Sequence, residues 1–501
     1  MRPVSPYPAG PHGAVPVHRN PSSAAAQSSL AARLSLTRPS VVSERVIRLI
    51  TVAISGLALA LMLISLRPFA ARLTYSSGAE DTGDALNQYG FLAAGGICLL
   101  ALLCIANRRV LTSLLSPGFL LLGLVLAFNL MRSPYPDLMM RALLFTLIGM
   151  LIAFTMVALP RNQADFRLAL GLGAGAALAL SYVGLVAFPD LAKHGFDAYE
   201  PQHSGLWRGH FSHKNIAGPV MSVIAIFGLY LMRSGQRLFG FIMFAAAAVF
   251  VANTGSKTTA GLFPVSIMIV MMAPVFASAG MAILTSMAAI AGVGIFTLGV
   301  LYRPDISLLV AKLTGDQTYT GRTTLWEFSL SMIPNKPWLG YGLYNFWQTE
   351  NVLGLDAPFE AAWDYRYIVH GHNNYLDILL NLGIVGGAVL CWVLFVAPMI
   401  NYAKARRKPA KRPMADMFFM IIVFASLLSF IETFFLARND AIWLMHIMAV
   451  FGLHLLARFE INPGPGPAAP RRPRTALQRF SGSASSRPAA LHNAPSGPPR
   501  G

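Results

Sequence analysis

Charge is scarce in this sequence, and acidic charge is scarcest. Only 12% of the 501 residues are charged, and 21 Asp and Glu residues stand against 39 Lys and Arg residues. A soluble domain is roughly a quarter charged, so this composition, with 55% hydrophobic residues, excludes an ordinary soluble protein. The net charge of +18 does not indicate nucleic-acid binding, because the cations lie in the two ends of the chain and in short segments between apolar runs.

Cysteine and nucleotide-binding motifs are also rare or missing. Cys98, Cys104 and Cys391 all fall inside apolar runs, without metal-ligand or disulfide spacing. The sequence has no phosphate-binding P-loop and no dinucleotide fingerprint. It also lacks the paired, Gly/Pro-broken helices of many transporters. We therefore expect no cofactor, and the energy for any reaction must come from a substrate or a gradient.

Long apolar runs dominate what is present. About twelve runs approach the ~20 residues needed to cross a bilayer, which predicts an all-α integral membrane protein built as a polytopic helix bundle. The runs lie near residues 47–66, 89–107, 112–131, 139–159, 168–188, 215–232, 238–254, 259–276, 281–301, 376–400, 416–436 and 441–457.

Charge in the connecting segments predicts the orientation of the bundle. Basic pairs and clusters recur in alternate loops, ending with the cluster at 404–412. By the positive-inside rule these loops face the cytoplasm. The Pro-, Ser- and Arg-rich segments 1–44 and 459–501 are then predicted to be disordered cytoplasmic tails, flanking a transmembrane domain at 45–458. An even number of spans with both tails inside is self-consistent, and it places the loops 189–214 and 302–375 on the outer side.

The most unusual stretch is residues 318–387, which is polar and aromatic although it lies between predicted apolar helices. It contributes about fifty residues before the next helix is expected to start, and long loops of this kind are usually functional. Around it, the outer face gathers cations with few opposing carboxylates: Arg208, Lys214, Lys257 and Arg322. Such a cluster suits a multiply charged anion such as phosphate. For Lys336 and Arg366, snorkelling at the membrane interface is the preferred interpretation.

Aromatic and imidazole groups in the same region leave several interpretations open. Trp326 and three further tryptophans of the large loop suit either an aromatic belt at the membrane face or platforms for sugar rings. His372 can accept a proton from a hydroxyl near neutral pH, and Asn373 can orient a neighbour. A structural role or a metal site remains an alternative for the histidines, although the metal signal is weak. Glu432 is an acid within a predicted span, for which a local pair with Arg438 is expected.

Several of these residues together resemble a known family. Gly-Arg322 opens the large loop, Pro337-x-x-Gly340-x-Gly342 follows, and His372-Asn373 precedes Gly383-x-x-Gly386-Gly387. With Phe211-Ser-His213-Lys-Asn215 and Ser256-Lys257-Thr, this pattern resembles the O-antigen ligase and polymerase superfamily over most of residues 45–457. The Ser-Lys-Thr element, where family ligases carry Ser-Arg-Gly, is more similar to the exopolysaccharide polymerase branch (ExoQ-like).

The resemblance implies a metal-independent membrane glycosyltransferase of the GT-C kind, acting in the periplasm of a bacterial inner membrane. Its donor would be an oligosaccharide on undecaprenyl pyrophosphate. His372 would be the catalytic base, and Arg322 would hold the pyrophosphate leaving group. The expected substrate-binding residues are Lys257, Arg208, Lys214, His213, Asn215, Asn373 and Trp326, with no metal ligand.

Two activities and one other class of protein remain open. A lipid-linked repeat unit as acceptor would make the protein a polymerase, and lipid A core would make it a ligase. A transporter of lipid-linked sugars would require ionisable residues spread deep along the spans, whereas here they collect on one face. Besides membrane lipid, the expected partners are the flippase and the chain-length regulator of a polysaccharide export pathway.

Overall fold

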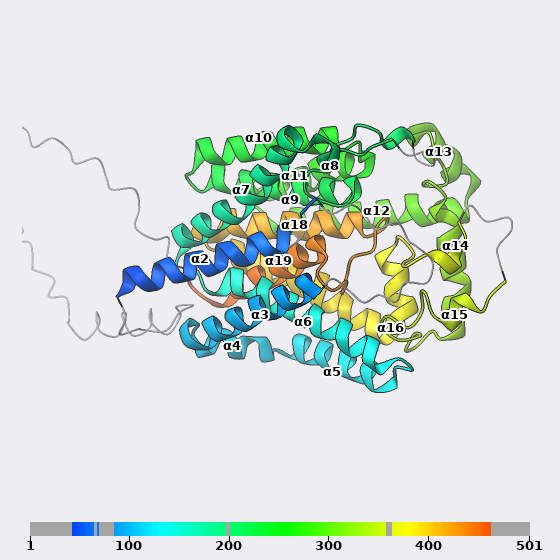
Figure 1. Cartoon of the computed structure of the whole chain (residues 1–501), viewed down its shortest axis with the longest axis horizontal. Helices are drawn as coiled ribbons and strands as arrows, with labels where there is room; N and C mark the ends of the chain where they lie inside the picture. Colours follow the sequence, from blue (N-terminus) through cyan, green and yellow to red (C-terminus); the bar gives the residue numbers. More distant parts are fainter. Residues whose placement is uncertain (1–42, 65–67, 70–84, 197–200, 357–362, 462–501) are drawn as a thin grey trace, which may run out of the picture.

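A computed structural model describes residues 43–64, 68–69, 85–196, 201–356 and 363–461 (Figure 1). The predicted tails 1–44 and 459–501 lie almost entirely outside these ranges, so their disorder and their cytoplasmic location stay predictions. Within the described residues the protein is helical, apart from one isolated bridge between Lys193 and Trp207.

Long helices form the body of the molecule, and shorter ones connect or cover them. The longer helices are α2 (Glu44–Leu63), α3 (Ala85–Ile105), α5 (Pro117–Arg132), α6 (Pro136–Ala158), α7 (Gln163–Ala187), α9 (Lys214–Arg233), α10 (Arg237–Asn253), α11 (Lys257–Val275), α12 (Ala279–Leu298), α16 (Asn374–Cys391), α18 (Arg412–Leu428) and α19 (Ala441–Arg458). The shorter ones are α4 (Arg108–Thr112), α8 (Pro189–Ala192), α13 (Pro304–Thr314), α14 (Arg322–Met332), α15 (Glu350–Leu353) and α17 (Ala397–Arg406).

Each of the twelve predicted apolar runs falls on a helix. In the described part of the chain, nine helices are long and apolar enough to cross a membrane, or ten if the bent pair α4–α5 counts as one span. The helices α10 and α18 are shorter, with 17 residues each. The protein is therefore a polytopic α-helical membrane protein, and the number of twelve spans stays a prediction.

One helix boundary differs from the prediction in a way that matters for the site. The run at 416–436 was expected to be helical throughout, but α18 ends at Leu428 and α19 begins at Ala441. The segment between them consists of turns, although it is rich in apolar residues. Glu432 consequently lies in an irregular segment and not inside a helix.

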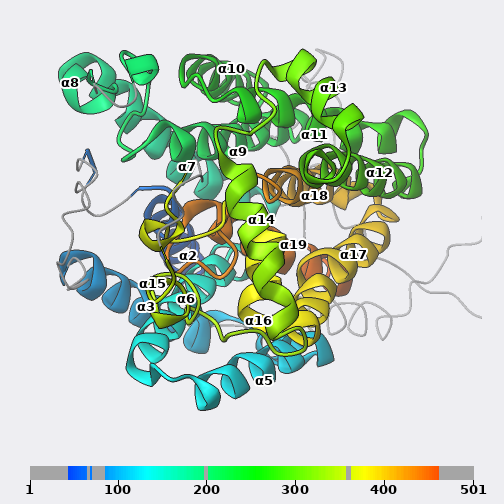
Figure 2. The same cartoon turned by 90° about the vertical axis from the view of Figure 1, so that its right-hand side faces the viewer.

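The large loop is also more structured than the sequence suggested. Helices α13, α14 and α15 lie in it, and α14 begins at Arg322 itself, about fifty residues before the helix that was expected to follow. Figure 2 shows these helices laid across one end of the bundle, facing the viewer, and Figure 1 shows them at the right. We call residues 302–373 the cap.

The cap is joined to α16 where that helix is broken. Gly383 has a φ of +63° inside α16. The N–H groups of Ile384 and Val385 donate to the carbonyls of Pro337 and Trp338, at 2.8 and 3.1 Å. A Cβ added at Gly383 would lie 2.4 Å from the backbone carbonyl carbon of Trp338. Only glycine allows the cap backbone to approach the helix this closely.

The Gly340–Gly342 turn makes a second set of backbone contacts with α16. Tyr341 and Gly342 donate their N–H groups to Leu380 and Asn381 of α16, at 2.7 and 2.8 Å. A Cβ at Gly340 would lie 2.6 Å from the backbone of Asn381. The carbonyls freed by the helix break are thus satisfied by the cap, as buried backbone groups require.

At the other end of the bundle, arginines near helix ends form ion pairs with buried aspartates. Asp416, fully buried near the start of α18, binds Arg233 at the end of α9 and Arg406 at the end of α17, at 2.8 and 2.7 Å. Arg48 of α2 binds Asp165 of α7 at 2.6 Å. Loops that the charge pattern grouped on one side therefore meet at one end. Their location in the cytoplasm stays a prediction.

Candidate active site

Three segments that are distant in sequence meet at Glu432. Nη2 of Arg322 lies 2.7 Å from one oxygen of the Glu432 carboxylate, and Nδ1 of His372 lies 3.2 Å from the other. The side chains of Arg322, Glu432 and His372 are 13%, 21% and 19% exposed, so the cluster is largely shielded yet open to solvent. It unites both residues predicted to be catalytic, and it joins them through a carboxylate.

Arg322 is positioned by the turn that opens α14. The carboxylate of Asp316 accepts hydrogen bonds from the N–H groups of Thr318 and Thr320, at 2.8 and 2.5 Å. Gly321 then adopts a φ of +82° and leads into the helix. A cation at a helix N-terminus meets the positive end of the helix dipole, so the carboxylate of Glu432 offsets an otherwise unfavourable position.

His372 is held in an uncommon backbone conformation. Its φ is +50°, a left-handed value that residues other than glycine rarely adopt. Asn373, directly after it, caps α16 by accepting hydrogen bonds from N–H groups of the first turn. Gly371, directly before it, donates its N–H to the carboxylate of Asp377 at 3.0 Å. Backbone strain of this kind persists where the surroundings impose it, frequently at active sites.

Asp377 ties the loop of His372 to the segment of Glu432. Besides Gly371, it accepts hydrogen bonds from the Thr433 hydroxyl at 2.6 Å and from the Trp347 indole at 2.8 Å. The carboxylate is buried, and its hydrogen-bonding capacity is used by three donors from three segments. Asp377 therefore fixes the spacing between the two halves of the cluster.

Asn374 fixes the Glu432 segment from the same helix start. Its side-chain oxygen accepts the N–H groups of Phe434 and Phe435, both at 2.9 Å. Its side-chain nitrogen donates to the Ser429 hydroxyl at 3.1 Å. The polar start of α16 thus supplies the acceptor for the N–H groups of Phe434 and Phe435 that a continuing helix would otherwise supply, and this allows the segment to leave the helix.

The charge of Glu432 decides the tautomer of the neutral His372 ring. Burial raises the pKa of Glu432, but the Arg322 guanidinium and the His372 hydrogen bond outweigh it and lower that pKa to about 2. An ionised carboxylate only accepts hydrogen bonds, so Nδ1 of His372 must donate. Nε2 is then the proton-accepting nitrogen in the neutral ring.

Two aromatic or imidazole rings border His372. The Trp363 ring centroid lies 5.8 Å from that of His372, and the Trp363 indole donates to the Thr320 carbonyl at 3.0 Å. The His370 ring centroid lies 4.2 Å from that of His372. Trp363 therefore connects the turn before Arg322 with the histidine, at the edge of the cluster.

Trp326 occupies a different place from the one expected for a sugar platform. Its side chain is fully buried in α14, with its ring centroid 5.3 Å from that of Tyr319. It packs in a small apolar core with Leu325 and Leu376. In this conformation it offers no ring face to a ligand, and it holds α14 against α16.

Lys257 lies near the turn that positions Arg322. It is the first residue of α11 and is exposed. Burial raises the pKa of Asp316, but hydrogen bonds from Thr318 and Thr320, together with the charge of Lys257, lower it overall. Lys257 therefore acts electrostatically on the same turn as Arg322.

The other four predicted binding residues lie around the start of α9. His213 caps this helix and accepts the N–H of Asn215 at 3.1 Å. Lys214 is buried, and its backbone N–H donates to His194 at 3.1 Å. Arg208 donates to a backbone carbonyl of its own loop at 3.1 Å. Their contacts with each other are local, and their role in binding stays a prediction.

The histidines of the loops that were predicted to lie outside have different roles. His210 is buried between the Ser181 hydroxyl and the Leu63 carbonyl, at 2.7 and 3.1 Å. Burial lowers the pKa of His210 to about 4, so it is a neutral structural residue. His194 and His203 pack against His213. Within the described ranges, no group of three or more His, Cys, Asp or Glu residues is arranged to hold a metal ion.

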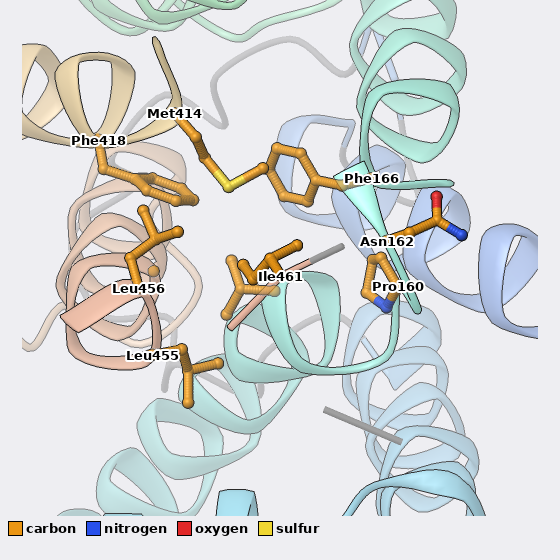
Figure 3. Close-up of a pocket in the computed structure, with 10 residues that line it drawn as sticks. Pro160, Asn162, Phe166, Met414, Phe418, Leu455, Leu456 and Ile461 are labelled. Atoms are coloured by element: carbon orange, nitrogen blue, oxygen red, sulfur yellow. The ribbon is translucent and has the colours of Figure 1, made fainter. Parts of the chain in front are cut away.

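Two cavities lie apart from this cluster. The first, shown in Figure 3, has a volume of about 10 Å³ and is lined mainly by apolar side chains such as Phe166, Met414 and Leu455. It lies where α18 begins, offers no acid or base, and holds at most about one water molecule. The second is larger and polar, and it adjoins the cap at the Gly340–Gly342 turn.

Residues 220–391, about a third of the chain, match the family described as O-Antigen ligase. This match contains Lys257, Arg322 and His372. This segment is similar to the O-Antigen ligase family. The matching segment ends before Glu432, which lies in the part of the chain that follows it.

A curated relative supports the same superfamily. The "Exopolysaccharide production protein ExoQ" of Rhizobium meliloti (strain 1021) is 28% identical over 109 residues. The match covers 21% of this chain and 24% of the relative, so it spans about a quarter of that protein's length.

The sequence allowed two residues of the cluster to be predicted, but not the contacts that join them. Arg322 and His372 were predicted, but Glu432 was expected to pair with its neighbour Arg438, and its long-range partners were not foreseen. Asp377 and Asn374 were not considered. Their signal is a pair of polar residues in the first turn of an apolar helix, where unpaired polar groups are costly.

Proposed function

We propose that this protein is a polysaccharide polymerase of the bacterial inner membrane, with both termini in the cytoplasm and the cap in the periplasm. It transfers a glycan from undecaprenyl pyrophosphate to a sugar hydroxyl of a lipid-linked acceptor. The observation that carries the proposal is the Glu432 carboxylate between Arg322 and His372. It joins a cation suited to pyrophosphate to an imidazole suited to a hydroxyl, beside an apolar bundle suited to a polyprenyl chain.

His372 acts as the general base in this mechanism. Glu432 accepts a hydrogen bond from Nδ1, so Nε2 takes the proton of the acceptor hydroxyl as that oxygen attacks the anomeric carbon of the donor. The new glycosidic C–O bond forms while the bond from the anomeric carbon to the phosphate oxygen breaks. Its electron pair leaves with undecaprenyl pyrophosphate, and the configuration inverts. A carboxylate partner also stabilises the imidazolium that results.

Arg322 stabilises the charge that develops on the leaving group. A guanidinium contacts phosphate oxygens in a bidentate way, and a preorganised cation is effective where negative charge appears in the transition state. In the structure described here Arg322 contacts Glu432, so donor binding shifts this contact toward the pyrophosphate. Lys257 adds charge from the neighbouring turn, and Arg208 and Lys214 are further candidates.

The acceptor separates the two activities that remain. The name of the relative, an exopolysaccharide production protein, favours a polymerase. The description of the matching family, O-Antigen ligase, keeps a ligase as the second candidate, with lipid A core as acceptor. Trp363, beside His372, is the aromatic ring best placed to meet a sugar in either case.

The deciding experiment compares wild type with His372→Ala in a strain deleted for this protein. We expect normal membrane levels of the variant, loss of polymer, and accumulation of undecaprenyl-linked repeat units. General-base catalysis contributes about 10²–10⁴-fold, so residual polymer should be hard to detect. Normal polymer from His372→Ala would overturn the mechanism.

Single repeat units on lipid A core in the deletion strain indicate a polymerase, and loss of all core attachment indicates a ligase.

A further inference from the structure

The larger cavity lies between the bundle and the cap, separate from the Glu432 cluster. It has a volume of about 410 Å³ and is formed by the end of α5, the start of α6, the Lys336–Gly342 turn and the start of α15. Small-molecule sites typically have volumes of roughly 300–1,000 Å³. The cavity is therefore large enough for a sugar residue and its neighbours.

The walls of this cavity are fixed by contacts outside it. Ser133, between α5 and α6, exchanges hydrogen bonds with the Asn345 side chain at 3.0 and 3.1 Å. The Asn351 side chain donates to the Asn345 carbonyl at 2.9 Å. The floor is the turn around Gly340, which is bonded to the broken helix α16. The bundle wall and the cap wall are thus held in one arrangement, which reduces the cost of ordering a ligand site.

The lining chemistry favours an acidic sugar over a lipid tail. Arg132 and Lys336 supply two cations, Glu350 supplies one carboxylate, and Tyr135 and Tyr341 supply aromatic rings. Nζ of Lys336 lies 4.6 Å from the Tyr341 ring centroid. Among the described residues, neither Arg132 nor Lys336 forms an ion pair within 4.0 Å. The aromatic faces and the hydroxyl-binding carboxylate of Glu350 suit a sugar ring, and the two cations suit a carboxylate or similar anion on it.

We propose that this cavity binds an anionic sugar residue of the glycan that the protein extends, as a subsite remote from the reaction centre. The inference rests on the proposed function and specifies its substrate: a saccharide repeat carrying at least one acidic group. Binding there anchors the glycan to the cap while its reactive end lies at His372. The Gly340–Gly342 turn then has two roles, since it fastens the cap to α16 and forms the floor of the subsite.

The test uses the purified full-length protein in lipid nanodiscs. The probes are oligosaccharides released from the producing strain's own exopolysaccharide and separated into acidic and neutral fractions by anion exchange. We expect wild type to bind the acidic fraction, and Lys336→Met and the double variant Arg132→Met/Lys336→Met to bind it about tenfold or more weakly, since each loses a charge-assisted contact. Lys312→Met, an exposed lysine of α13, is the matched control and should bind as wild type does.

The outcomes separate this inference from the proposed function. Unchanged binding by the double variant, binding of the neutral fraction alone, or no binding by wild type would each overturn the subsite. Both cations are exposed, so the variants should fold, and their thermal unfolding is measured in parallel. His372→Ala should bind the acidic fraction normally but make no polymer. Normal polymer from that variant would overturn the proposed mechanism instead, whatever the binding measurement gives.

Discussion

At the scale of single residues, the site depends on one carboxylate in a protein with few of them. Glu432 holds the guanidinium of Arg322 and the imidazole of His372 at the same time. Removing it would leave a cation largely buried without its counter-ion, and a histidine without the group that fixes its tautomer. One substitution at Glu432 therefore tests both halves of the proposed mechanism.

Glu432→Gln should lower transfer strongly without removing the protein from the membrane. An amide of the same shape can still contact His372, but it no longer guarantees that Nδ1 carries the proton. We expect a loss near the lower end of the roughly 10²–10⁴-fold range for general-base catalysis. The measurement is polymer formed per unit of membrane protein. Activity within about twofold of wild type would contradict the role of the carboxylate.

The same substitution should change how stability depends on pH. The pKa of Glu432 falls from 4.5 to about 2 on folding, so its contribution is fully present above pH 4.5. That contribution is lost as the pH falls from 4.5 toward 2. Thermal unfolding of purified wild type and Glu432→Gln is compared across this window. The stability difference between them should shrink as the pH falls, and a constant difference would refute the assignment.

Asp377→Asn tests the connection beneath the site. The amide would turn a donor toward one of the groups that now donate to Asp377, namely Gly371, Trp347 or Thr433. A buried unsatisfied donor costs about 1–3 kcal/mol. We expect a lower melting temperature and reduced polymer formation. Asp364→Asn is the control, because Asp364 pairs with Arg366 near the surface, where ion pairs contribute roughly 0–1 kcal/mol. Equal effects from both variants would rule out a special role for Asp377.

At the scale of elements, α16 organises the end of the molecule that carries the cap. Its start follows His372 directly, and its first turn carries the side chains that hydrogen-bond the Glu432 segment. Its break at Gly383 accepts the backbone of the cap. A single helix therefore positions the loop of His372 at its start and the cap at its middle. The two glycine-containing motifs, distant in sequence, are halves of one contact.

Gly383→Ala should destabilise the protein far more than Gly387→Ala in the same helix. A Cβ at Gly383 would lie 2.4 Å from cap backbone and would require a positive φ, whereas one at Gly387 would make ordinary contacts at 3.5 Å. Alanine is favoured over glycine in a regular helix by about 1 kcal/mol. We expect a large fall in melting temperature for Gly383→Ala and no fall for Gly387→Ala. Similar melting temperatures for the two variants would show that the cap contact tolerates movement.

The sequence allowed the helices to be predicted but not the breaks between them. Apolar runs placed all twelve segments. Arg322 and Lys257 were singled out because cations collect in the same loops, and His372 as an imidazole able to accept a proton and through the family resemblance. The end of α18 at Leu428 was missed, since Ser429–Phe435 still carries four large apolar residues. What ends the helix is the competing hydrogen bonding of Asn374 and Asp377, from a segment more than fifty residues away, and no local pattern reports such a contact.

At the scale of the whole molecule, charge separates the two ends of the bundle. One end carries Asp416 with Arg233 and Arg406, and the other carries the Glu432 cluster and the polar cavity. The first arrangement anchors helix ends, whereas the second leaves side chains open to solvent. This polarity is what the positive-inside rule uses to predict which end faces the cytoplasm.

Cysteine labelling of intact cells tests that orientation. In a background with Cys98, Cys104 and Cys391 changed to Ser, Tyr367→Cys in the cap should react with a membrane-impermeant maleimide that has crossed the outer membrane. Arg407→Cys should react only after the inner membrane is opened. Both positions are exposed, so access depends on the side of the membrane. The reverse pattern would invert the topology and place the Glu432 cluster in the cytoplasm.

The contact between Arg322 and Glu432 has a consequence for turnover. On the proposed mechanism, the enzyme between cycles supplies its own counter-ion, and each incoming pyrophosphate must compete with a tethered carboxylate for the same guanidinium. The measured affinity for the donor then reflects the difference between the binding free energies of pyrophosphate and of the Glu432 carboxylate at Arg322, and not the binding free energy of pyrophosphate alone. When the glycan has been transferred, return of the carboxylate to Arg322 helps to expel the spent lipid carrier, so the same pair that weakens donor binding keeps the product from blocking the next round.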